Sequence, residues 1–360
     1  MSAPELPGFP RLATVCLLAV GLLASCMGYG PRTIERDRMD YGLSLKASLK
    51  QQLLSNIVGI RYMDAPIFVE VSSIINQYAI SGNVQAGVGF NTSFNSGDTG
   101  RIGGGGRWED RPTITYAPIS GQKFAESLLT PIHPEALFAL VQSGWPAEVM
   151  FRLVVKSING VEDSHEGQLY RKQADPHYRE LLFVWTRLRQ QGLLGLKRSS
   201  DKMEEATIVL YLAEKDMSEQ AQQDIDFLRT TLGLRSEANE YTLTYGLVPV
   251  EQDEIAVLTE SILDLMVDLA WQVDVPQEHI DTGRTGSTFI DTGLGGRLFI
   301  VHYSEDEPED AYVAIRDRGY WFYIDDHDMI TKQTFGLLQV LLSLTDAGGE
   351  ARGPVVSIGR

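Results

Sequence analysis

The first regular hydrophobic pattern of this chain has the period of a helix. Leucine and isoleucine recur three or four residues apart from Leu45 to Ile60, which places them on one face of an amphipathic helix. Ser44 is of a type that caps helix N-termini, and Pro66 ends the pattern. We therefore expect a helix between these two residues.

The pattern then changes to that of extended chain. Residues 67–95 are rich in β-branched, aromatic, serine and glycine residues, which predicts strands, with a turn at 81–83. Residues 96–107 contain six glycines and few apolar side chains. Such a segment buries too little surface to offset the entropy of ordering its backbone. We expect a mobile loop there, followed by a strand at 113–116.

Helical and extended patterns alternate over the remaining chain. The expected helices are 121–145 (in two pieces), 177–191, 218–232, 254–272 and 329–345. The expected strands are 149–158, 206–213, 240–247, 297–303, 311–316, 319–324 and 355–358.

This order of elements predicts an α+β fold, or mixed α/β, with helices covering sheet faces. Its N-terminal half, residues 43–165, is β-rich and contains the glycine segment. A C-terminal α/β domain of alternating strands and helices covers residues 176–360. The apolar pattern is interrupted near 160–175, where we place a soft boundary.

Residues 1–25 are an export signal rather than part of the fold. An apolar run extends over residues 12–24, too short for a membrane-spanning helix and suited to a signal peptide. It ends in Leu23-Ala24-Ser25-Cys26, which resembles the lipobox of bacterial lipoproteins. The resemblance implies that Cys26 becomes the lipidated N-terminus, with residues 26–42 as a tether to the folded body.

The other cysteine agrees with this interpretation. Cys16 lies in the segment that is removed, so the mature chain has neither a free thiol nor a disulfide. Met27 follows Cys26, and the sorting rule of such lipoproteins then implies transport to the outer membrane. We expect a lipid-anchored protein on the periplasmic side of that membrane.

Charge excludes one class of partner. The 360 residues include 31 Lys+Arg and 48 Asp+Glu, a formal net charge of −17. Nucleic-acid binding requires clustered basic residues that neutralise phosphates. We therefore expect that this chain does not bind nucleic acid. The hydrophobic fraction, 43%, is sufficient for a globular core.

Short catalytic and metal-binding motifs are absent from the sequence. No two of the six histidines have a metal-like spacing; they are His133, His165, His177, His279, His302 and His327. We therefore predict no catalytic residue, cofactor or metal ligand, and we regard an enzyme as the less favoured class.

Two acidic clusters have alternative interpretations. Residues 305–310 hold five carboxylates and are either a weak Ca²⁺ site or, as we favour, a solvated hairpin loop. Asp325, Asp326, His327 and Asp328 lie between an expected strand and the last helix. Such a junction is a common place for an active site, but we favour capping of the helix by Asp328 or Thr331.

Several stretches together resemble a family of uncharacterised proteobacterial outer-membrane lipoproteins. The resemblance covers most of the mature chain and implies no activity, cofactor or catalytic residue. The stretches are Asn56-Ile57-Val58, Arg61-Tyr62, Asp64-Ala65-Pro66, Val71-Ser72-Ser73-Ile74, Arg111-Pro112-Thr113-Ile114-Thr115-Tyr116, Ser143-Gly144-Trp145-Pro146 and Phe322-Tyr323-Ile324-Asp325-Asp326.

Three functions stay open at this point. The first is a structural or interaction component of the cell envelope, held at the membrane by the lipid on Cys26. The second is a subunit of an oligomeric envelope channel or export assembly, in which each copy donates strands from residues 67–116 to a shared sheet. The third is an envelope hydrolase with a site near Asp325 and Asp326.

Replacing Cys26 directly tests the predicted lipidation and membrane targeting. In Cys26→Ala the acceptor sulfur is lost, so we expect the chain to lose labelled palmitate and to leave the membrane fraction. Cys16→Ala is the matched control and should retain both. Unchanged labelling and fractionation of Cys26→Ala would show that the interpretation of residues 1–26 is wrong.

Overall fold

The computed structural model describes residues 29–75, 78–89, 99–110, 113–162, 165–167, 170–172, 175–199, 207–213, 217–288 and 297–346. Cys26 and the strand expected at 355–358 lie outside these residues. The described part contains nine helices and mixed sheets, so the predicted α+β fold is confirmed.

The larger sheet of the body has six strands. Their order is β6 (Val161–Glu162), β5 (Val155–Ile158), β12 (Glu254–Thr259), β11 (Glu240–Tyr245), β10 (Thr207–Leu212) and β9 (Leu194–Ser199). Only β11 and β12 are parallel. This sheet takes strands from both sides of the boundary expected near 160–175. The short strands β7 (His165–Gly167) and β8 (Tyr170–Lys172) form a separate hairpin.

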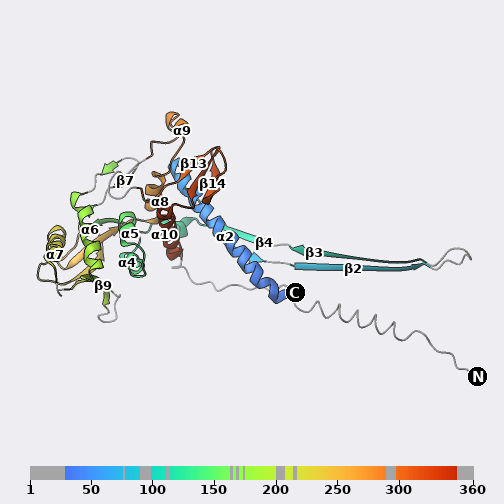
Figure 1. Cartoon of the computed structure of the whole chain (residues 1–360), viewed down its shortest axis with the longest axis horizontal. Coiled ribbons are helices and arrows are strands. Elements are labelled where there is room, and N and C mark those ends of the chain that lie inside the picture. The colour runs from blue at the N-terminus through green and yellow to red at the C-terminus, as the bar shows by residue number, and fades with distance from the viewer. Residues whose placement is uncertain are drawn as a thin grey trace, which may run out of the picture.

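Four helices accompany this sheet. They are α4 (Pro134–Gln142), α5 (Ala147–Val154), α6 (Pro176–Gln190) and α7 (Glu219–Leu232). Gly233 ends α7 in the left-handed conformation, as its glycine predicts. Figure 1 shows α6 and α7 at one end of the molecule.

A three-stranded sheet completes the body. Its order is β13 (His302–Ser304), β15 (Tyr320–Asp325) and β14 (Ala311–Asp317), and β14–β15 is the hairpin expected at 311–324. The remaining helices are α2 (Tyr29–Arg61), α3 (Gly121–Leu128), α8 (Ile262–Ala270), α9 (Gln277–Asp281) and α10 (Met329–Asp346). One continuous apolar core, from Leu53 to Leu341, joins the two sheets.

Helix α2 is longer than predicted. It has 33 residues and begins at Tyr29, not at Ser44, so the tether expected at 26–42 is helical from Tyr29 onward. Residues 29–43 are mostly polar and lack an apolar face, which is why the hydrophobic pattern missed them. No residue from 38 to 52 is buried, whereas Leu53 and Leu54 enter the core. The first part of α2 therefore projects from the body.

Two predicted elements are wrong in type. The helix expected at 254–272 is strand β12 followed by α8, and the strand expected at 149–158 begins as helix α5. Both segments are continuous apolar runs, in which periodicity cannot separate a buried strand from a buried helix. In segment 254–272 the local signal that separates strand from helix is the reciprocal capping box of Ser261 and Asp264, which starts α8.

A buried arginine joins the end of α2 to the body. Arg61 is fully buried, and its guanidinium donates to Thr285 Oγ1 and to the carbonyl oxygen of Gly286, each at 2.7 Å. The guanidinium also lies over the Trp271 ring, 4.5 Å from its centroid. Burial lowers the pKa of Arg61 to about 10, so it stays charged at neutral pH. The joint fixes the direction in which α2 leaves the core.

Removing this arginine should destabilise the body. Arg61→Leu loses hydrogen bonds from a charged donor and leaves their acceptors unpaired, which costs about 2–4 kcal/mol in the free energy of unfolding. Arg61→Lys keeps the charge but lacks the planar fork, so it should recover only part of the loss. Urea unfolding of the Cys26→Ala chain measures both, and wild-type midpoints would contradict the role assigned to Arg61.

Candidate assembly interface

A long two-stranded ribbon stands away from the body (Figure 1). It consists of β1 (Val69–Ile75) with β4 (Thr113–Pro118), and of β2 (Tyr78–Gly89) with β3 (Thr99–Asp110), both antiparallel. The register of the outer part of the first pair, beyond an irregularity between Val71 and Ser73, continues in the second pair: Ile75 lies opposite Thr113, and Tyr78, three residues later, lies opposite Asp110. The two pairs therefore form one ribbon, which we call the ribbon below.

The ribbon corrects two predictions. Ser81 lies opposite Arg107 within the ladder, so residues 81–83 are strand and not a turn. The glycine segment expected to be a loop at 96–107 is strand from Thr99 onward, with Gly103 to Gly106 paired to residues 82–85. The composition argument considered the segment alone, whereas the partner strand supplies its hydrogen bonds. Residues 90–98 lie outside the described part.

The outer part of the ribbon, β2 with β3, has two chemically different faces. Alternate residues of a strand belong to opposite faces of its sheet, and each β2 residue is paired with a β3 residue of the same parity. The even-numbered face consists of Tyr78, Ile80, Gly82, Val84, Ala86, Val88, Gly100, Ile102, Gly104, Gly106, Trp108 and Asp110. The odd-numbered face consists of Ala79, Ser81, Asn83, Gln85, Gly87, Gly89, Thr99, Arg101, Gly103, Gly105, Arg107 and Glu109. One face is almost entirely apolar, and the other holds most of the polar residues.

Apolar residues are exposed at the inner part of the ribbon as well. Ile74 and Ile114 lie opposite each other and are 36% and 39% exposed. Tyr116 is 62% exposed. Contiguous exposed apolar surface marks an interaction site more often than scattered single residues do. The inner part of the ribbon therefore presents apolar side chains to solvent.

The body end of the β1 edge is covered by two side-chain amides of α2. Asn56 accepts from the N–H of Ile67 and donates to its C=O, both at 2.9 Å. Gln52 accepts from the N–H of Val69 at 2.7 Å and donates to its C=O at 3.4 Å. The two amides thus replace a neighbouring strand at alternate residues. Gln52, which is half-buried in the structure, was not singled out from the sequence, because one glutamine on a helix forms no distinctive pattern.

The β4 edge ends at the same level. Ile119 donates its N–H to Phe68 across the ribbon at 2.8 Å, so Pro118 faces the outer edge, where it has no N–H to offer. Beyond Val69 and Pro118, no strand of the described residues pairs with either outer edge. The ribbon is protected against edge pairing at the body and open to it farther out.

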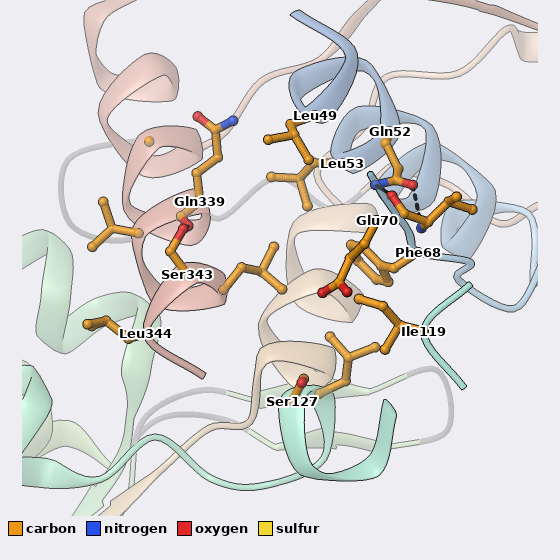
Figure 2. Close-up of a pocket in the computed structure, with 15 residues that line it drawn as sticks. Leu49, Gln52, Leu53, Phe68, Glu70, Ile119, Ser127, Gln339, Ser343 and Leu344 are labelled. Carbon is orange, nitrogen blue, oxygen red and sulfur yellow. Dashed lines mark hydrogen bonds between the residues drawn. The ribbon is translucent and has the colours of Figure 1, made fainter. Parts of the chain in front are cut away.

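An apolar cleft lies at the root of the ribbon. Its volume is about 490 Å³, and Figure 2 shows Leu49 and Leu53 of α2 on one side of it and Gln339 and Ser343 of α10 on the other. Leu49, Leu53, Phe68 and Ile119 are among the lining residues. The single ionisable residue of its described lining is Glu70, which pairs with Lys123 at 2.6 Å. This lining has no set of groups for catalysis.

The acidic cluster after β15 forms a turn and a helix cap. Asp325 accepts from the His327 N–H at 2.7 Å, and Asp326 pairs with Lys332 at 2.8 Å. These hydrogen bonds lower the pKa of both carboxyls. Asp328 accepts from the Thr331 N–H at 3.0 Å at the start of α10. The capping interpretation is confirmed.

The other acidic cluster and the histidines form no site in the described residues. Residues 305–310 connect β13 to β14, but β13 pairs with β15, so the expected hairpin loop is wrong; the segment is a mostly exposed crossing connection. Within the described part, no group of His, Cys, Asp and Glu could hold a metal ion. His279 is buried and lies 2.7 Å from the Tyr62 hydroxyl, a packed position inside the body.

Comparison with protein-family models, with curated proteins and with solved structures finds no match to this chain. Among the described residues, no helix has both the length and the apolar character needed to cross a membrane.

The two amides that cover the β1 edge can be replaced by apolar side chains of similar size. In the double variant Gln52→Leu, Asn56→Leu the backbone groups of Ile67 and Val69 lose their partners, so we expect a loss of about 1–3 kcal/mol in stability. Their amide hydrogens should exchange with solvent at least tenfold faster. Gln51→Leu, an exposed position on the same helix, is the control. Unchanged exchange at both residues would contradict the edge-covering role.

Proposed function

We propose that this chain is a lipid-anchored subunit of a homo-oligomeric cell-envelope assembly. The lipid on Cys26 holds each copy at the periplasmic side of the outer membrane. Copies join through the outer edges of the ribbon, beyond Val69 and Pro118. The observation that supports this proposal is the ribbon itself, in which β2 and β3 form twelve residue pairs with no further strand beside them among the described residues.

Such a ribbon requires a partner for physical reasons. An isolated two-stranded hairpin is at best marginally stable in water. The four consecutive glycines, Gly103 to Gly106, weaken this one further, since glycine loses the most conformational freedom and offers no side chain for packing. Each unpaired edge also presents a row of N–H and C=O groups that can pair with another strand.

A second copy of the same chain fits both edges. If the β2 edge of one copy pairs with the β3 edge of the next, the contact is head to tail, and a closed ring leaves no edge unpaired. A symmetric dimer through one edge would leave the other open. The covered edges at Val69 and Pro118 confine this pairing to the part of the ribbon away from the body.

The competing hydrolase hypothesis loses its main support. Asp325 and Asp326 motivated it, and both carboxylates are engaged in a turn and an ion pair. The hypothesis of a structural or interaction component of the envelope is compatible with the ribbon. The homo-oligomer is a more specific version of that hypothesis, in which the interaction partner is another copy of the chain.

Cross-linking between two single-cysteine variants tests head-to-tail pairing. We expect Ser81→Cys on β2 and Arg107→Cys on β3 to cross-link when co-expressed as lipidated chains, because these edges would meet between copies. Each variant alone should cross-link at least several-fold less. Phe183→Cys, an exposed position on α6, is the control and should not cross-link. Absence of the mixed cross-link would overturn the proposal, and cross-linking of one variant alone would replace it with a symmetric dimer.

A further inference from the structure

We infer that β2 and β3 enter the lipid bilayer, with the even-numbered face against acyl chains and the odd-numbered face lining a water-filled passage that favours anions. This inference rests on the proposed function, because backbone edges must be paired with neighbouring copies before they can leave water. It adds a second partner, the bilayer hydrocarbon, and an activity, the passage of small ions.

The length of the outer ribbon matches a bilayer. Twelve residues at about 3.3 Å each give about 40 Å, and a tilt of about 40° reduces the rise to about 30 Å. Strands that cross a membrane need about 9–11 residues. The strands β2 and β3 have 12 residues each, so they are long enough to cross at that tilt.

The distribution of apolar, polar and aromatic residues on the outer ribbon matches that of strands that cross a bilayer. A strand between lipid and water alternates apolar and polar residues and has aromatic residues at the level of the headgroups. On the even-numbered face, Tyr78 and Trp108 stand at the end nearest the body, and Ile80, Val84 and Val88 follow. The aromatic residues would then lie at the periplasmic surface and the aliphatic ones within the hydrocarbon.

Helix α2 would place the lipid on Cys26, and so the membrane surface, near the start of β2. Cys26 precedes Tyr29, the first residue of α2, by only three positions. The 24 residues from Tyr29 to Leu53 span about 36 Å, which separates the lipid from the buried end of α2. In Figure 1 the start of α2 and the start of β2 lie at a similar position along the long axis, and the ribbon extends farther in the same direction.

The charges of the odd-numbered face determine the expected selectivity. Each copy contributes Arg101 and Arg107 to this face and one acidic residue, Glu109. The remaining polar residues there are neutral. An excess of fixed positive charge along a narrow aqueous path concentrates anions.

Adjacent positions of β2 provide a matched test of insertion. Single cysteines at Val84 and Gln85 have nearly the same depth but belong to opposite faces. In vesicles containing the full lipidated chain, we expect a charged, water-soluble maleimide to label Gln85→Cys at least tenfold faster than Val84→Cys. A fluorophore on Val84→Cys, attached before reconstitution, should be quenched by brominated lipids. Equal aqueous labelling of both positions, or no quenching at Val84→Cys, would overturn the inference.

Conductance across a planar bilayer tests the passage. The assembled chain should conduct, and its reversal potential in a KCl gradient should show anion preference. Arg101→Gln with Arg107→Gln should move that potential to the cation side of the wild-type value, whereas Arg179→Gln, exposed on α6, should not. Absence of conductance from a cross-linked assembly overturns this inference alone, whereas absence of the mixed cross-link overturns the proposed function.

Discussion

Every N–H and C=O group on the outer edges of a strand needs a hydrogen-bond partner in protein before it can leave water, and this requirement shapes the ribbon and its joint to the body. At the body the chain meets it internally, through the amides of Gln52 and Asn56 and through Pro118. Farther out the described residues supply no partner. The positions of Gln52, Asn56 and Pro118 therefore mark where edge groups with partners in the chain give way to edge groups without one among the described residues.

The incomplete part is held in a defined direction by a rigid joint. Arg61 fixes the end of α2 against the segment that contains Thr285 and Gly286, while Gln52 and Asn56 fix the start of the ribbon against the same helix. Helix and ribbon therefore leave the core as one unit. If Cys26 carries the proposed lipid, this joint relates the position of that lipid to the start of β2.

Local signals predicted those parts of the fold in which they were strong. The α+β class follows from the order of helical and extended patterns, whereas the helix that ends at Gly233 and the cap at Asp328 follow from single residues with a known conformational role. The ribbon could not be predicted as such, since Gly103 to Gly106 pair with residues about twenty positions earlier. A glycine run has no strand propensity of its own, and only the register of the partner strand gives it one. The same holds for Gln52, whose role depends on a strand edge that the sequence does not place beside it.

In the proposed assembly, the glycine run would also affect when copies pair. A ribbon that is weak alone forms few stable contacts while copies are dilute, and its pairing rises steeply with their local concentration. The lipid proposed on Cys26 would confine all copies to one surface in a common orientation, which would increase their effective concentration without any new contact. The anchor would then control the timing of assembly as well as the location of the protein, because strand pairing would become favourable only after delivery to the membrane.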